Sequence, residues 1–162
     1  MQPFKKAAGV DLDWKSGGLL SRAYALVGGE QVFAILKFDD VATAKTAQES
    51  WTFKHYGFLP AYVSAWVAGT ETEVARIPLA FGGSGTLALK GGRKYEWADR
   101  GFWNGKWRFI GATGKDAVRL EPCPSLFKTD YRVVMEDCTH PDMPLLVTIG
   151  WYMVLLRQQQ SG

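Results

Sequence analysis

The last part of the chain is apolar on every face of any regular element it could form. Residues 144–156 read Pro-Leu-Leu-Val-Thr-Ile-Gly-Trp-Tyr-Met-Val-Leu-Leu, and Arg157 and three glutamines follow. Asp142 and Pro144 occupy the places of a helix N-cap and a first-turn proline. The length of the run predicts a helix over about 142–159, with a central strand as the alternative.

A helix without a polar face must be buried either in protein or in lipid. The uninterrupted apolar stretch is about 12 residues, whereas a membrane span needs about 20, so we expect no transmembrane span. Burial in protein requires neighbours on all sides of the helix. A sheet that closes around the helix would supply them, and it would also remove its own edge strands.

The rest of the chain has the rhythm of short strands. From about residue 10 to residue 136, segments of alternating apolar and polar residues recur between glycine-rich turns. Residues 22–27 and 31–38, for example, flank Gly28-Gly29-Glu30 and read as a hairpin. Roughly ten to twelve such strands are typical of an antiparallel sandwich or barrel. We predict one domain over 1–162, mainly β: a closed antiparallel β-barrel of about 12 strands around the buried C-terminal α-helix.

The composition excludes some classes of function. Apolar residues make up 47% of the chain and charged residues 22%, which excludes a disordered protein. The net charge of +3 is too small to suggest nucleic acid as a partner. The basic N-terminus is not followed by an apolar h-region, so we expect no signal peptide and a cytoplasmic location.

The sequence offers no arrangement for catalysis or metal binding. Cys123 and Cys138 form no CxxC pair, and the spacing of His55 and His140 completes no zinc site. We expect reduced structural thiols, with a disulfide or a functional thiol as open alternatives. Each histidine reads as structural, and the paired aspartates of the chain read as solvated surface. We therefore predict no catalytic residue, no cofactor and no metal, and a protein that is not an enzyme.

Three stretches of the chain resemble the tubby-like superfamily, which includes tubby C-terminal domains, phospholipid scramblases and LURP-one-related proteins. They are residues 50–58 (SWTFKHYGF), 85–97 (GTLALKGGRKYEW) and 149–156 (IGWYMVLL). The resemblance is a rhythm of strands followed by a terminal helix, and it covers most of the chain. It implies a compact member of the family, with a strand barrel around a hydrophobic C-terminal helix. Because tubby domains bind phosphoinositides, it also implies contact with anionic phospholipid.

One charged constellation fits such a contact. If residues 93–98 and 105–110 form a hairpin, Lys94, Lys106 and Arg108 lie on its polar face. Tyr95, Trp97, Trp107 and Phe109 then face inward. Each positive charge near an anionic membrane surface contributes about 1 kcal/mol. A solvated barrel exterior is the alternative interpretation. The candidate lipid-contact residues are Lys90, Arg93, Lys94, Arg100, Trp103, Lys106 and Arg108.

Three functional hypotheses follow from these observations. The first is a non-enzymatic binding or interaction module of tubby-like fold, which contacts anionic phospholipid or a protein partner at the periphery of a membrane. The second is a lipocalin-like small-molecule carrier with an open lumen, and the third is a hydrolase that uses a cysteine or a histidine. The place of the C-terminal helix bears on the first two, because a helix inside the barrel leaves little room for a ligand.

Overall fold

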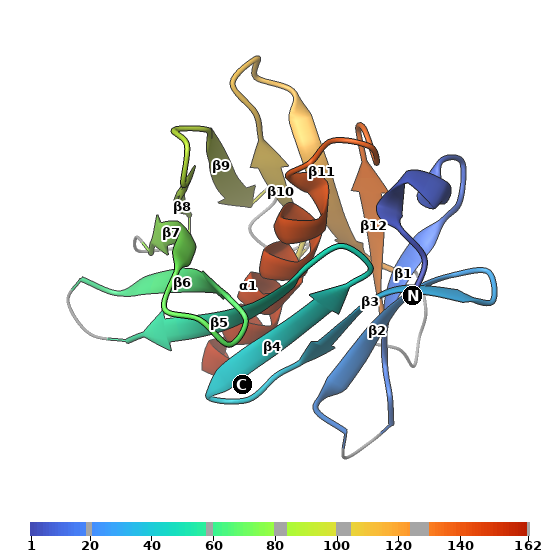
Figure 1. Cartoon of the computed structure of the whole chain (residues 1–162), viewed down its shortest axis with the longest axis horizontal. Helices are drawn as coiled ribbons and strands as arrows, with labels where there is room; N and C mark the ends of the chain where they lie inside the picture. Colours follow the sequence, from blue (N-terminus) through green and yellow to red (C-terminus); the bar gives the residue numbers. More distant parts are fainter. Residues whose placement is uncertain (19–20, 58–59, 80–83, 100–104, 124–129, 162) are drawn as a thin grey trace.

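The computed structural model describes residues 1–18, 21–57, 60–79, 84–99, 105–123 and 130–161 (Figure 1). In this part of the chain, twelve strands form one antiparallel sheet and a single α-helix follows them. The helix is α1 (Met143–Ser161). The strands are β1 (Leu12–Ser16), β2 (Ala23–Gly28), β3 (Gln31–Lys37), β4 (Val41–Thr46), β5 (Ser50–Tyr56), β6 (Tyr62–Val67), β7 (Glu73–Pro78), β8 (Gly85–Leu89), β9 (Lys94–Asp99), β10 (Trp107–Ile110), β11 (Asp116–Pro122) and β12 (Tyr131–Met135).

The sheet closes on itself. Each strand pairs with its neighbours in the sequence, and β1 pairs with β12 in the register Leu12↔Val133 and Trp14↔Tyr131. Side chains alternate across the wall of the barrel as the pleat requires. In β5, for example, Trp51 and Phe53 are buried inside, whereas Lys54 is exposed outside. The predicted fold class, a closed antiparallel barrel with one C-terminal helix, is confirmed.

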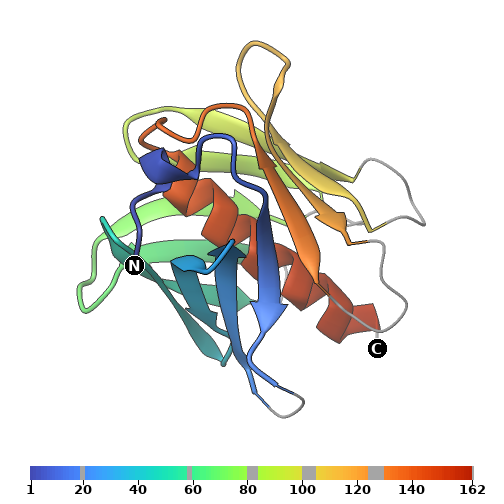
Figure 2. The same cartoon turned by 90° about the vertical axis from the view of Figure 1, so that its right-hand side faces the viewer.

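The helix runs through the barrel from one open end to the other (Figure 2). Every residue from Met143 to Leu156 is buried, and exposure begins at Arg157. The N–H of Leu146 donates to the carbonyl of Asp142 over 3.0 Å, so Asp142 is the residue that starts the helical hydrogen-bond ladder. The predicted helix therefore agrees with the observed one to within two residues at each end.

Three consecutive helix residues contact three different parts of the barrel wall. Successive residues of an α-helix point about 100° apart, so these three side chains cover most of its circumference. Trp151 stacks on Trp14 of β1, with ring centroids 5.7 Å apart and planes 6° apart. Tyr152 packs against Phe53 of β5, with centroids 5.5 Å apart. Gly150 faces β9, β10 and β11. The helix is thus the common core of strands that lie far apart around the barrel.

The barrel has two ends, between which α1 runs (Figure 2). The entry mouth is the end at which α1 begins, and the exit mouth is the end at which α1 finishes. Because β12 leads into the start of α1, antiparallel pairing places the β8–β9 and β10–β11 turns at the entry mouth. The 3₁₀ helix η1 (Phe4–Ala7) also lies beside the start of α1 (Figure 2), where Phe4 packs edge-on against Phe33.

Within the residues described, the structure contains no helix that is both long enough and apolar enough to cross a membrane.

Gly150 provides a test of how closely the helix and the wall fit together. A Cβ atom built on Gly150 would lie 3.1 Å from Leu120 Cδ1, 3.3 Å from Phe109 Cε2 and 3.4 Å from Trp97 Cζ3. We expect Gly150→Leu to destabilise the fold by about 1–3 kcal/mol or more, because the added atoms overpack a filled core. Chemical denaturation measures this change. Ala88→Leu is the matched control, because Ala88 is exposed on the outer face of β8; equal stability of the two variants would contradict the close fit.

Candidate functional site at the entry mouth

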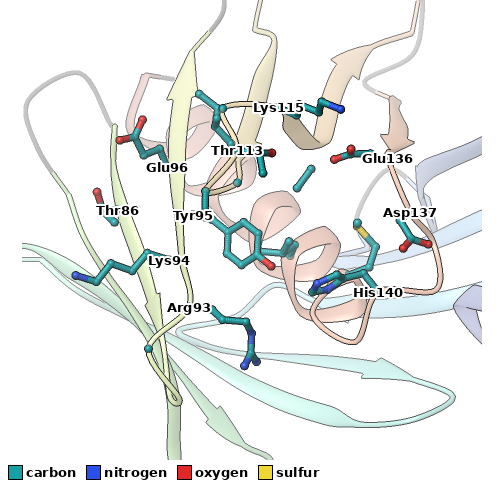
Figure 3. Close-up of a pocket in the computed structure, with 18 residues that line it drawn as sticks. Thr86, Arg93, Lys94, Tyr95, Glu96, Thr113, Lys115, Glu136, Asp137 and His140 are labelled. Carbon is teal, nitrogen blue, oxygen red and sulfur yellow. The ribbon is translucent and has the colours of Figure 1, made fainter.

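A cavity of about 820 Å³ opens at the entry mouth (Figure 3). It lies between the ends of β9, β10 and β11 on one side and the segment that joins β12 to α1 on the other. Tyr95, Ala117, Met143 and Leu146 give it a largely apolar floor, and polar side chains stand around its rim. This combination of an apolar floor and convergent polar groups is typical of a small-molecule site.

Asp142 anchors the side of the cavity where the helix begins. Arg93 binds its carboxylate with two hydrogen bonds, from Nε to Oδ2 over 2.6 Å and from Nη2 to Oδ1 over 2.8 Å. The hydroxyl of Tyr95 donates to Oδ2 over 2.7 Å. The Asp142 side chain is only 5% exposed, whereas that of Arg93 is 54% exposed. A buried carboxylate thus joins the β8–β9 turn, β9 and the start of α1.

This network sets the protonation state of both buried groups. Burial alone would raise the pKa of Asp142, but the hydrogen bonds from Arg93 and Tyr95 and the charge of Arg93 outweigh it, so the pKa lies below its ordinary value. For Tyr95, burial and then the hydrogen bond to the carboxylate raise the pKa above its ordinary value. Tyr95 therefore stays a neutral donor while Asp142 stays ionised across the neutral range.

His140 completes this side of the cavity. Its Nδ1 accepts a hydrogen bond from the backbone N–H of Asp142 over 3.1 Å and lies 3.9 Å from Oδ2 of the same residue. Because Nδ1 is the acceptor, the neutral ring carries its proton on Nε2. The side chain is 41% exposed, so Nε2 can donate to a molecule in the cavity. The sequence predicted a structural role for His140. The hydrogen bond to Nδ1 gives it one, and the side chain is at the same time accessible from the cavity.

The charges on the rim are of both signs. Lys94 and Lys115 supply positive charge, and Glu96, Glu136 and Asp137 supply negative charge. Figure 3 shows Lys94 and Glu96 pointing away from Tyr95, so their charges belong to the outer rim. The rim can therefore meet a charged group outside the cavity, while the interior offers Tyr95, His140 and the exposed part of Arg93.

The structure divides the predicted lipid-contact residues between the two mouths. Lys90, Arg93 and Lys94 lie at the entry mouth, in and beside the β8–β9 turn. Lys106 is exposed at the start of β10, towards the exit mouth. Because Glu96 pairs with Ile110, Lys106 is offset from Lys94 by about six residues of strand, roughly 20 Å.

The remaining members of that predicted set have other surroundings. Arg108 forms an ion pair with Asp116, with Nη1 2.9 Å from Oδ1, so its charge is already matched. Arg100 and Trp103 lie outside the described residues. The predicted hairpin is confirmed as the β9–β10 pair, and its four inward aromatic residues are buried. Lipid contact by these residues stays a prediction.

Sequence reasoning missed the residues that shape the cavity. Asp142 was interpreted only as a helix cap, but its carboxylate binds Arg93 and Tyr95 across a sequence separation of more than 40 residues. A signal did exist for Tyr95, because a phenol on the inward face of a strand needs a buried polar partner.

Neither cysteine lines this cavity. Cys123 and Cys138 are both free and half-buried, so they do not form the disulfide that the sequence left open. Burial, followed by the nearby charge of Asp13, raises the pKa of the Cys123 thiol, which makes it less reactive. Within the described ranges, no group of three or more His, Cys, Asp or Glu side chains is arranged to hold a metal ion.

Comparisons of the chain with protein-family models, with curated proteins and with solved structures find no match. The resemblance to tubby-like domains therefore stays a prediction from the sequence.

The Asp142 network predicts a specific dependence of stability on pH. A carboxyl group whose folded-state pKa lies below its ordinary value of 3.8 stabilises the fold above that pH, and this contribution is lost as the pH falls through the folded-state pKa. We expect Asp142→Asn to be less stable than the unaltered protein by about 1.5–3 kcal/mol at neutral pH, the contribution of hydrogen bonds to a charged group. The difference should be constant down to about pH 5 and shrink below about pH 4. Urea denaturation over a pH series measures it; a difference that grows on acidification would contradict the assignment.

Proposed function

We propose that the chain is a non-enzymatic binding module of tubby-like fold that contacts the headgroups of anionic phospholipids at its entry mouth. The observation that supports this proposal is the cavity of about 820 Å³, whose rim carries Arg93, Lys94 and Lys115 above an apolar floor. Cations at a rim pair with headgroup phosphates, while an apolar floor accepts the less polar part of the same molecule.

The strength of such a contact follows from the charges on the rim. Lys94 and Lys115 have no ion pair within the described residues, and each would contribute about 1 kcal/mol near an anionic surface. Arg93 is bound to Asp142, so it offers only the part of its guanidinium that remains exposed. The three carboxylates of the rim oppose the attraction. The proposed contact is therefore modest in affinity and sensitive to salt.

The filled barrel supports a binding module over the lipocalin-like carrier. A carrier needs an open lumen, and residues 143–156 occupy the centre of this barrel. The hydrolase hypothesis would need a cysteine beside a histidine. Cys138 and His140 both line a smaller cavity of about 320 Å³, but within the described residues no hydrogen bond joins their side chains, because His140 Nδ1 accepts from the backbone of Asp142 instead. A module of this kind would act from the cytoplasm, at the periphery of a membrane.

Cosedimentation with vesicles tests the proposal. The unaltered protein should bind vesicles of phosphatidylcholine that contain an anionic phospholipid at low salt, and should not bind phosphatidylcholine alone. The double variant Lys94→Glu/Lys115→Glu should lose this binding, because it reverses both free charges of the entry rim. The vesicle series should include phosphatidylserine and a phosphoinositide, which separates general attraction to negative charge from recognition of one headgroup.

A matched variant controls for net charge. Lys37→Glu/Lys106→Glu makes the same change in net charge at exposed positions towards the exit mouth. It should retain most of the binding. Equal losses in the two double variants would overturn the placement of the site, and failure of the unaltered protein to bind any anionic vesicle would overturn the proposed function.

A further inference from the structure

A second cavity, of about 300 Å³, lies at the exit mouth. The β3–β4 turn, the end of β5 and the last buried turns of α1 enclose it. Phe38, His55, Tyr152 and Leu156 line its interior, and charged side chains stand at its opening. It is about the size of the smallest ligand sites in proteins.

Tyr152 brings an unpartnered hydroxyl to this cavity. The residue is 1% exposed, yet its hydroxyl makes no hydrogen bond within the part of the chain that the structure describes. In the described part of the chain, three side-chain nitrogens are sealed from solvent and have no hydrogen-bond partner. They are Nε1 of Trp14, Nε of Arg108 and Nε1 of Trp151. The Tyr152 hydroxyl is not one of these sealed atoms, so it opens into the cavity that the residue lines. Buried tyrosine hydroxyls normally have a hydrogen-bond partner, so the partner of this one is a molecule that enters the cavity, either water or a ligand that replaces it.

His55 adds a second hydrogen-bonding group. His55 lies two residues after the buried Phe53 in β5, so both side chains are on the inward face of the strand. The His55 side chain is half-buried. Burial lowers the pKa of His55 and raises that of Tyr152. Both groups are therefore neutral near pH 7, and together they can donate and accept hydrogen bonds to an uncharged polar group.

The opening of the cavity carries one free charge of each sign. Arg22 and Asp39 form an exposed ion pair, with Nη1 3.7 Å from Oδ1. Asp40 and Lys54 have no ion-pair partner within the described residues; the Lys54 ammonium lies 5.1 Å from the ring centroid of Tyr56. A ligand that presents an ammonium to Asp40 and a carboxylate to Lys54 would match both charges.

We propose that the exit-mouth cavity is a binding site for a free α-amino acid with an uncharged polar side chain, such as glutamine. The ammonium and carboxylate of the ligand pair with Asp40 and Lys54 at the opening, and its side chain reaches Tyr152 and His55 inside. Phe38 and Leu156 pack against the aliphatic part of the ligand. This site is separate from the entry mouth and does not depend on the phospholipid proposal.

Isothermal titration of the full chain with L-glutamine tests the proposal. Saturable binding in the millimolar range is expected for the unaltered protein. Tyr152→Phe should weaken it by roughly three- to tenfold, the effect of one hydrogen bond. Asp40→Asn and Lys54→Gln should each weaken it as well. Ethanolamine and propionate, which each carry only one of the two charges, should bind more weakly than glutamine.

Thermal unfolding separates a ligand-binding hydroxyl from a structural one. Without an amino acid, Tyr152→Phe should unfold at the same temperature as the unaltered protein or at a higher one, because the hydroxyl has no protein partner to lose. Tyr95→Phe is the matched control: it loses the hydrogen bond to Asp142, so it should be less stable but bind glutamine unchanged.

Three results would overturn the proposal. The first is no saturable binding of L-glutamine, L-asparagine or L-threonine at millimolar concentration. The second is binding of ethanolamine or propionate as tight as that of glutamine. The third is unchanged glutamine affinity in Tyr152→Phe.

Discussion

The packing of α1 against the inner face of the barrel is the interaction on which the rest of the structure depends. The helix has no polar face to turn towards water, and the inward residues of the strands have no other partner large enough to fill the space between them. Trp151, Tyr152 and Gly150 meet walls of the barrel that are far apart in the sheet. Each element is therefore stable only with the other, which couples sheet closure to helix formation.

Because α1 fills the centre of the barrel, the two cavities proposed as binding sites lie at its ends. At the entry mouth, the first residue of the helical ladder, Asp142, also holds Arg93 and Tyr95, so the start of the helix positions the walls of the larger cavity. At the exit mouth, Tyr152 belongs to the helix core through its ring and to the smaller cavity through its hydroxyl. In both places the site is built from residues that the fold already requires.

The fold could be predicted from the sequence because its signals are local and agree with one another. The alternation of strands such as β5 and the uniformly apolar run at 144–156 each point to one structure. The sites could not be predicted in the same way. The contact of Arg93 with Asp142 depends on where the helix enters the barrel, and the separation of Lys94 from Lys106 depends on the strand register. Neither the entry point of the helix nor the strand register can be derived from the spacing of residues along the chain.

The protection of α1 in native-state hydrogen exchange tests the central claim most directly. A helix enclosed by a closed sheet can exchange its amide protons only when the whole domain opens. The account predicts that the amides of residues 147–156 exchange with the free energy of global unfolding measured by denaturation. Exchange of these amides at the faster rates of a helix that detaches from the barrel surface would contradict it.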